Sequence, residues 1–190
     1  MSGVDRVLVA GVGNLFLGDD GFGVETVRRL RTRPLPAHVE VVDFGVRGVH
    51  LAYQLLEGYR TLVLVDATDR GLAPGTVVMI EPTAGPVEAV ALDGHRMNPD
   101  AVLALLATLS AGTGTAPPER VLVVGCQPES VEEGIGLSAP VTAAVDEAVE
   151  LILRVLAEEE TWQGESRHAA DPAATTASRT MRKASPCGKS

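Results

Sequence analysis

Aromatic residues are scarce in this chain of 190 residues, at 3% of the total, with one Trp, two Tyr and three Phe. The core must therefore be built from Val, Leu, Ile and Ala, which contribute to a hydrophobic content of 45%. Such side chains suit a parallel sheet whose strands are buried on both faces by helices. The length is sufficient for one domain of ordinary size with its own core.

Cysteine and the usual hydrolase motifs are also nearly absent. Cys126 and Cys187 are the only cysteines, and their spacing fits neither a metal site nor a disulfide framework. This favours a reducing compartment, and we expect a cytoplasmic protein. Cys126 ends an apolar stretch and is interpreted as a buried structural thiol. There is no Gly-x-Ser-x-Gly elbow for a serine nucleophile and no His-Glu-x-x-His zinc helix.

Long apolar runs and excess positive charge are missing as well. No run reaches the length of about 18 residues that a membrane-spanning helix needs. The formal net charge is −9, which argues against nucleic acid or an anionic membrane as the main partner. Nothing in the sequence specifies an oligomer, and we expect a monomer.

The last part of the chain lacks aliphatic side chains. Residues 157–190 contain no Leu, Ile, Val or Phe. Residues 161–190 contain five Lys or Arg and two Asp or Glu, so this stretch is basic. Such a segment cannot bury enough apolar surface to offset its ordering entropy. We therefore predict an α/β/α domain over residues 1–159 and a disordered basic tail over residues 160–190.

Within the predicted domain, strand patterns alternate with helix patterns. Strands are predicted at 6–12, 39–44, 61–67, 75–81 and 120–126, and helices at 21–33, 48–58, 98–110 and 138–159. The third and fourth strands are separated by too few residues for a crossover helix, so we expect that pair to be antiparallel at an edge. The predicted fold is α/β, a three-layer α/β/α sandwich around a mostly parallel five-stranded sheet.

The first strand leads into the stretch VLVAGVGNLFLGDDGFGVETVRRL, which begins like a nucleotide-binding loop. Gly11 and Gly13 fit the dinucleotide fingerprint, but Phe16 occupies its third glycine position. Asp19 and Asp20 then precede the helix, where two fixed carboxylates would repel a pyrophosphate. Helix capping explains one of these aspartates and leaves the other free to face outward.

Further polar residues follow the other predicted strands. Asp43 ends the second strand, Asp66 ends the third, and His95 lies in the polar loop LDGHRMNPD. Ligands of open α/β sheets bind outside the carboxyl ends of the strands, at the switch point of strand order. Asp20, Asp66 and His95 would together offer two oxygens and one nitrogen to a divalent transition ion such as Zn or Ni. The alternatives are that Asp66 caps a loop and that His95 is a surface residue.

Several stretches resemble the hydrogenase maturation endopeptidases, which process the large subunit of nickel-iron hydrogenases. The resemblance covers roughly residues 5–156, and it includes GVGNLFLGDDGFGV, VVDFGVRG, LVLVDA, DGHRMNP and VVGCQPESVEEGIGLSAPV in the order of the family. It departs from the family pattern at Phe44 and Arg47, where small residues are common. The resemblance implies a single α/β/α domain that removes a short C-terminal extension after nickel insertion.

The same resemblance implies the roles of the candidate residues. The nickel-binding positions of the family match Asp20, Asp66 and His95, and Asp43 matches a position thought important for cleavage or recognition. The nickel would be supplied by the substrate, the large-subunit precursor, and would not be permanently bound to the chain. It would either polarise the scissile carbonyl or activate water, or it would only position the substrate while Asp43 acts as base.

Two other functions use some of the same features. A metal-delivery or chaperone module would bind the immature large subunit through the same three ligands without cutting it. A Rossmann-like nucleotide-binding protein is disfavoured by Phe16, although Asp43 stands where a ribose-binding acid would be.

Overall fold

The computed structural model describes residues 6–81, 108, 112 and 114–169, with the side chains of 160–169 left undescribed. The chain divides into two compact units, Met1–Leu153 and Arg154–Ser190. Apart from residue 108, the predicted helix at 98–110 lies outside the described residues, and so does the tail after residue 169. In the part of the chain that is described, no helix is both long and apolar enough to cross a membrane.

The first unit contains a five-stranded sheet, as predicted. Its strands are β1 (Val7–Val12), β2 (Val39–Gly45), β3 (Thr61–Ala67), β4 (Val77–Ile80) and β5 (Arg120–Cys126), in the spatial order β2-β1-β3-β5-β4. The pairs β1–β2, β1–β3 and β3–β5 are parallel, and β4 is antiparallel to β5 at the edge. The antiparallel edge strand is therefore confirmed. Its hydrogen-bonded partner is β5 and not β3, so the expected pairing of the third and fourth strands is wrong: β5 lies between β3 and β4 in the sheet.

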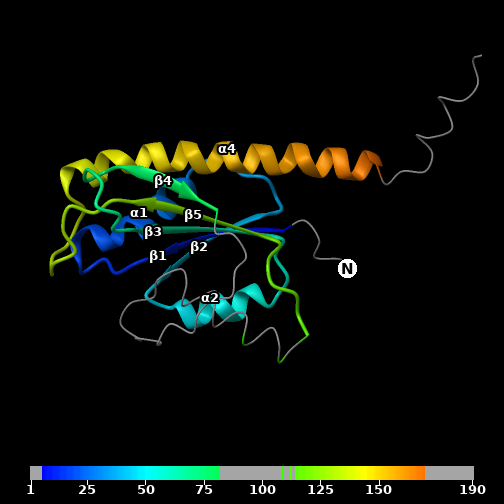
Figure 1. Cartoon of the computed structure of the whole chain (residues 1–190), viewed down its shortest axis with the longest axis horizontal. Helices are drawn as coiled ribbons and strands as arrows, with labels where there is room; N and C mark the ends of the chain where they lie inside the picture. Colours follow the sequence, from blue (N-terminus) through cyan, green and yellow to red (C-terminus); the bar gives the residue numbers. More distant parts are fainter. Residues whose placement is uncertain (1–5, 82–107, 109–111, 113, 170–190) are drawn as a thin grey trace, which may run out of the picture. The chain divides into compact units, whose positions relative to one another are not determined.

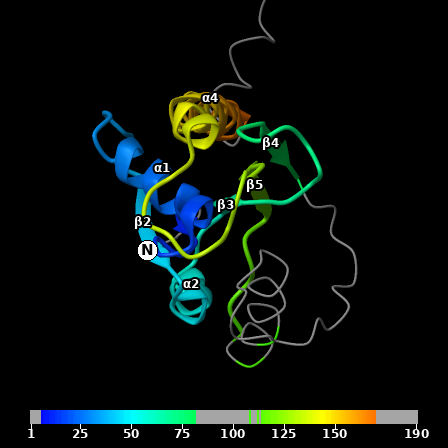
Figure 2. The same ribbon diagram turned by 90° about the vertical axis from the view of Figure 1, so that its left-hand side faces the viewer.

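Helices cover both faces of the sheet. A 3-10 turn, η1 (Gly18–Gly21), leads into α1 (Phe22–Leu30) on one face, and α2 (Gly48–Leu55) lies on the other face (Figure 1). The first part of α4 (Ala139–Ala169) lies beside α1 (Figure 2), and ion pairs join Arg29 to Asp146 at 2.7 Å and Arg33 to Glu150 at 2.9 Å. The predicted three layers are confirmed in the first unit.

The two faces of β1 show why its sequence is continuously apolar. Leu8 and Ala10 belong to the core cluster that includes Leu51 and Leu55 of α2. Val7 and Val9 alternate with them and are also buried, so they lie on the opposite face of the sheet. A strand with buried residues on both faces cannot show polar alternation, which is typical of parallel sheets between helices.

The last helix is longer than the predicted 138–159, since α4 extends to Ala169. The stretch after Leu156 begins with Ala157, Glu158 and Glu159, which are good helix formers. The loss of aliphatic residues therefore ends the apolar pattern without ending the helix. The predicted domain boundary after residue 159 stays a prediction.

Candidate active site

The strand order identifies the switch point of the sheet. From β1 the chain moves first to β2 on one side and then to β3 on the other, so the switch point lies at the carboxyl ends of β1 and β3. Asp66 is the sixth residue of β3, which ends at Ala67, and Asp20 lies in η1, directly after the loop that follows β1. Two of the four predicted site residues therefore come from the two strands that flank the switch point.

The carboxylate of Asp20 is held by the loop after β1. The amide of Asn14 donates a hydrogen bond of 2.6 Å to its Oδ2 atom. A close approach of backbone makes this possible, because a β-carbon at Gly13 would lie 1.8 Å from the Asp20 carbonyl oxygen. Gly13 also has a φ of 128°, which side chains rarely permit. Among the described residues, no hydrogen bond reaches the second carboxylate oxygen, which leaves it available to a ligand.

Asp66 is buried, with 8% of its surface exposed. Burial raises its pKa well above the ordinary value, the negative charge of Asp20 raises the pKa further, and the amide of Ala67 lowers it only in part. The negative charge of Asp20 is thus near enough to disfavour ionisation of Asp66. A second negative charge near a buried carboxylate is costly, and a bound cation would relieve that cost.

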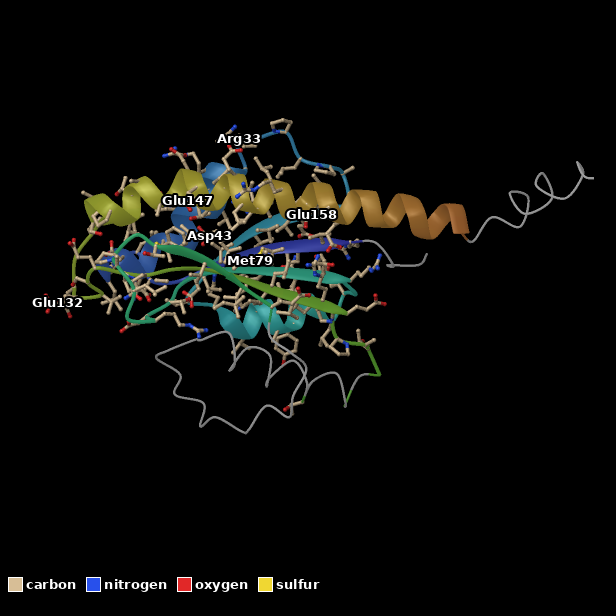
Figure 3. All side chains as sticks on the ribbon, turned by 45° about the horizontal axis from the view of Figure 1, so that its top comes forward. Arg33, Asp43, Met79, Glu132, Glu147 and Glu158 are labelled. Atoms are coloured by element: carbon tan, nitrogen blue, oxygen red, sulfur yellow. The ribbon has the colours of Figure 1, made fainter. Side chains whose placement is uncertain are left out.

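The side chain of Asp43 lies on the opposite face of the sheet from that of Asp66. Asp43 pairs in register with Gly11, which in turn pairs with Val65, so the side chains of these positions point to one face and that of Asp66 to the opposite face. Its carboxylate forms an ion pair of 3.3 Å with Arg28 of α1, and Figure 3 labels it close to that layer. The structure therefore places Asp20 and Asp66 at the same end of the sheet and Asp43 on the side of α1.

His95 lies outside the described residues, so the predicted set of three ligands stays a prediction. In the described ranges, there is no group of three or more His, Cys, Asp or Glu residues arranged to hold a metal ion. Asp20 and Asp66 alone leave an ion with open positions, which a third ligand and the substrate would have to fill.

Asp19 has a role that the sequence did not reveal. It makes no side-chain capping bond to η1 or α1. Its carboxylate, which is 1% exposed, instead accepts hydrogen bonds from the amides of Glu129 (2.8 Å) and Ser130 (3.2 Å) and from both the amide (2.6 Å) and the hydroxyl (2.9 Å) of Ser138. Ser138 directly precedes α4, where a helix N-terminus favours a negative charge.

The physical consequence is a fixed connection between the first and last loops of the site. Burial by itself would raise the pKa of Asp19, but the amide and hydroxyl donors outweigh it and lower the pKa. Helix capping, which the sequence suggests for one of the two aspartates, is therefore not the role of Asp19. The signal was present in part, because the N-cap position Ser138 lies in a motif that the resemblance had singled out, but only the fold shows that the two motifs meet.

Gln127 connects the other two loops at this edge of the sheet. Its Oε1 atom accepts hydrogen bonds from the amides of Arg70 (2.7 Å) and Leu72 (3.1 Å), and its Nε2 atom donates to Oδ1 of Asp69 (3.0 Å). The loop after β3 is thereby attached to the end of β5. This arrangement fixes the backbone that follows Asp66.

The fold and the site together define a class: a three-layer α/β/α protein with a carboxylate pair, in place of a phosphate-binding loop, at the switch point of its sheet. A family model described as hydrogenase maturation protease matches residues 24–155. The chain belongs to the hydrogenase maturation protease family.

Individual relatives agree with this assignment. The hydrogenase 2 maturation protease of Escherichia coli is 34% identical over 155 residues, which cover 80% of this chain and 92% of the relative. The hydrogenase expression/formation protein HoxM of Azotobacter vinelandii is 36% identical over 157 residues, covering 80% and 73%. The solved structure of the hydrogenase maturating endopeptidase HybD from Escherichia coli has a TM-score of 0.64 at 37% identity, covering 80% and 93%.

Proposed function

We propose that this protein is a processing endopeptidase that removes the C-terminal extension from the large subunit of a nickel-iron hydrogenase after nickel has been inserted. Its main support is the buried Asp66 beside Asp20 at the switch point, in a chain of the hydrogenase maturation protease family. The precursor of the large subunit is the proposed partner. A cytoplasmic location and a monomeric state belong to the same proposal.

The nickel in this proposal belongs to the substrate. Carboxylate oxygens and an imidazole nitrogen are suitable ligands for a divalent transition ion, and Asp20, Asp66 and His95 would supply them. The position of Asp20 and Asp66 at the switch point supports this assignment. Three ligands from separate loops, with no thiolate among them, leave an ion with open positions. A resting protein without precursor should therefore hold no stoichiometric, chelator-resistant metal, which elemental analysis of the purified protein would measure.

The carboxylates would make cleavage depend on the metal content of the precursor. Nickel bound in the precursor supplies a Lewis acid that can polarise a carbonyl or activate water. Asp20, fixed by the amide of Asn14, would orient the precursor with its available oxygen. The side chain of Asp43 lies on the opposite face of the sheet from that of Asp66 and forms an ion pair with Arg28. This position favours a role for Asp43 in contacting the substrate over a role as the base that abstracts a proton beside Asp66.

Cleavage of defined precursors tests the proposal. The protein is mixed with nickel-loaded and nickel-free large-subunit precursor, and intact mass is measured over time. We expect loss of a C-terminal fragment only from the nickel-loaded form. Asp20→Asn and Asp66→Asn should each abolish it, and the double variant should be no worse, since the residues act on one ion.

Asp146→Asn is a matched control, because it makes the same chemical change on an exposed residue of α4. It should process the precursor normally. Equal cleavage of the nickel-free precursor would overturn the nickel dependence. Stable binding of the precursor with no mass change would instead favour a non-cleaving metal-delivery or chaperone module.

A further inference from the structure

Three large apolar side chains are exposed on the loops beside the candidate site. Phe16 is 69% exposed, Val131 44% and Ile135 86%. Phe16 lies in the loop after β1, and the other two lie in the segment between β5 and α4. We call these three residues the apolar rim. Isolated exposed apolar residues are common, but a group of them on adjoining loops indicates a binding surface.

The two loops are joined by backbone hydrogen bonds. The amide of Gly134 donates to the carbonyl of Phe16 at 2.9 Å, and the amide of Gly18 donates to the carbonyl of Gly134 at 3.0 Å. The amide of Asp19 donates to the carbonyl of Ser130 at 3.1 Å. Phe16 and Ile135 are therefore held on neighbouring stretches of backbone, and the carboxylate of Asp19 reinforces the same junction.

The rim is continuous with the site. The amide of Phe16 donates to Oδ1 of Asn14 at 3.0 Å, and the amide of Asn14 donates to Oδ2 of Asp20 at 2.6 Å. A single hydrogen-bonded turn thus carries both an exposed aromatic ring and the candidate ligand. A segment bound on the rim would lie next to the reacting part of the substrate.

The rim also carries negative charge. Glu129, Glu132 and Glu133 are exposed in the same loop, and none of them forms an ion pair within the described residues. Figure 3 labels Glu132 at the outer end of this loop. Unpaired exposed carboxylates around an apolar surface are complementary to a partner that combines apolar and basic side chains.

We propose that the apolar rim and its glutamates form a docking surface for a segment of the large-subunit precursor that carries both apolar and basic side chains. The inference rests on the proposed function for the identity of the partner. A second copy of this chain is a poorer occupant. A two-fold contact would bring the same glutamates together and repel.

Binding and cleavage are measured separately so that the two proposals can fail separately. Nickel-free precursor is immobilised and titrated with protein by biolayer interferometry, and nickel-loaded precursor is used for KM and kcat. Ile135→Ser and Phe16→Ser are each expected to raise Kd and KM about fivefold to tenfold with kcat nearly kept. Glu132→Lys should raise Kd about threefold to tenfold at low salt, and much less at high salt.

Matched controls carry the same changes elsewhere. Met79→Ser alters an exposed apolar residue of the edge strand β4, and Glu147→Lys reverses an exposed charge on α4. Both controls should leave Kd and KM unchanged. Rim variants that bind like their controls, or wild-type protein that does not bind the precursor, would overturn the docking surface.

The remaining outcomes are also decisive. Wild-type protein that binds but does not cut would overturn the proposed function, while the comparison of Kd values would still test the rim. Rim variants that change only the self-association of the protein, measured by sedimentation, would assign the surface to a second copy and contradict the proposal.

Discussion

The carboxylate of Asp19 should be the most important polar group for the stability of the site loops. The informative change is Asp19→Asn, which keeps the shape of the side chain and replaces one oxygen by an NH₂ group. In the wild-type protein, Oδ2 accepts from two amides and a hydroxyl, and Oδ1 accepts from the amide of Ser138. The asparagine can keep an oxygen facing the three donors only by turning its NH₂ group toward the Ser138 amide.

The magnitude follows from this inventory. The bond from the Ser138 amide is replaced by two donors that face each other, which costs about 1–3 kcal/mol. The other three bonds lose the charge of the acceptor, and each becomes weaker by about 1 kcal/mol. The asparagine avoids burying a charge, and this offsets part of the loss. We therefore expect a net decrease of about 3 kcal/mol in the free energy of unfolding.

Urea unfolding at neutral pH is the assay. With an m value of about 2 kcal/mol/M, a loss of 3 kcal/mol lowers the urea midpoint by about 1.5 M. The matched control Asp146→Asn removes only an ion pair between exposed side chains, and its effect should be below about 0.5 kcal/mol. A midpoint for Asp19→Asn equal to that of the control would refute the importance of these bonds.

The pH dependence gives a second check with a defined sign. The pKa of Asp19 is lowered in the folded protein from an ordinary value of 3.8. Its contribution to stability is therefore complete above pH 3.8 and is lost as the pH falls from there through the folded-state pKa. The difference in stability between wild type and Asp19→Asn should shrink on acidification within that window and stay constant at higher pH.

Three further predictions concern other parts of the chain. A β-carbon at Gly23 would lie 2.1 Å from the carbonyl oxygen of Val65, so Gly23→Ala should destabilise by about 1–3 kcal/mol in thermal unfolding, although helix propensity alone favours Ala. Burial, with the hydrogen bond to Glu40, raises the pKa of Tyr59 from 10.0 to about 12. The stability advantage of wild type over Tyr59→Phe, about 1–2 kcal/mol at neutral pH, should therefore be lost as the pH rises from 10.0 to about 12. Removal of residues 170–190 should leave the thermal unfolding midpoint unchanged. A loss of several kcal/mol in the free energy of unfolding would contradict the predicted tail.

The sequence by itself was sufficient for the five strands, the layers and the family. Apolar runs bounded by turn residues determine strands such as Thr61–Ala67 and Arg120–Cys126, which the structure reproduces with the same bounds. These signals are local, since each depends on residues within one or two turns of chain. The position of Asp20 and Asp66 at strand ends was also readable, because the carboxyl ends of parallel strands meet at one edge.

Only the tertiary structure decided which of these groups meet. The pairing of β4 with β5, the opposite faces taken by Asp43 and Asp66, and the contacts of Asp19 all depend on register and strand order. Asp19 and Ser138 are 119 residues apart in the sequence, and Phe16 becomes part of an apolar rim only when Gly134 is bonded beside it. Local propensity contains no information on such distant pairs, because they form when packing of the whole sheet brings its loops to one edge.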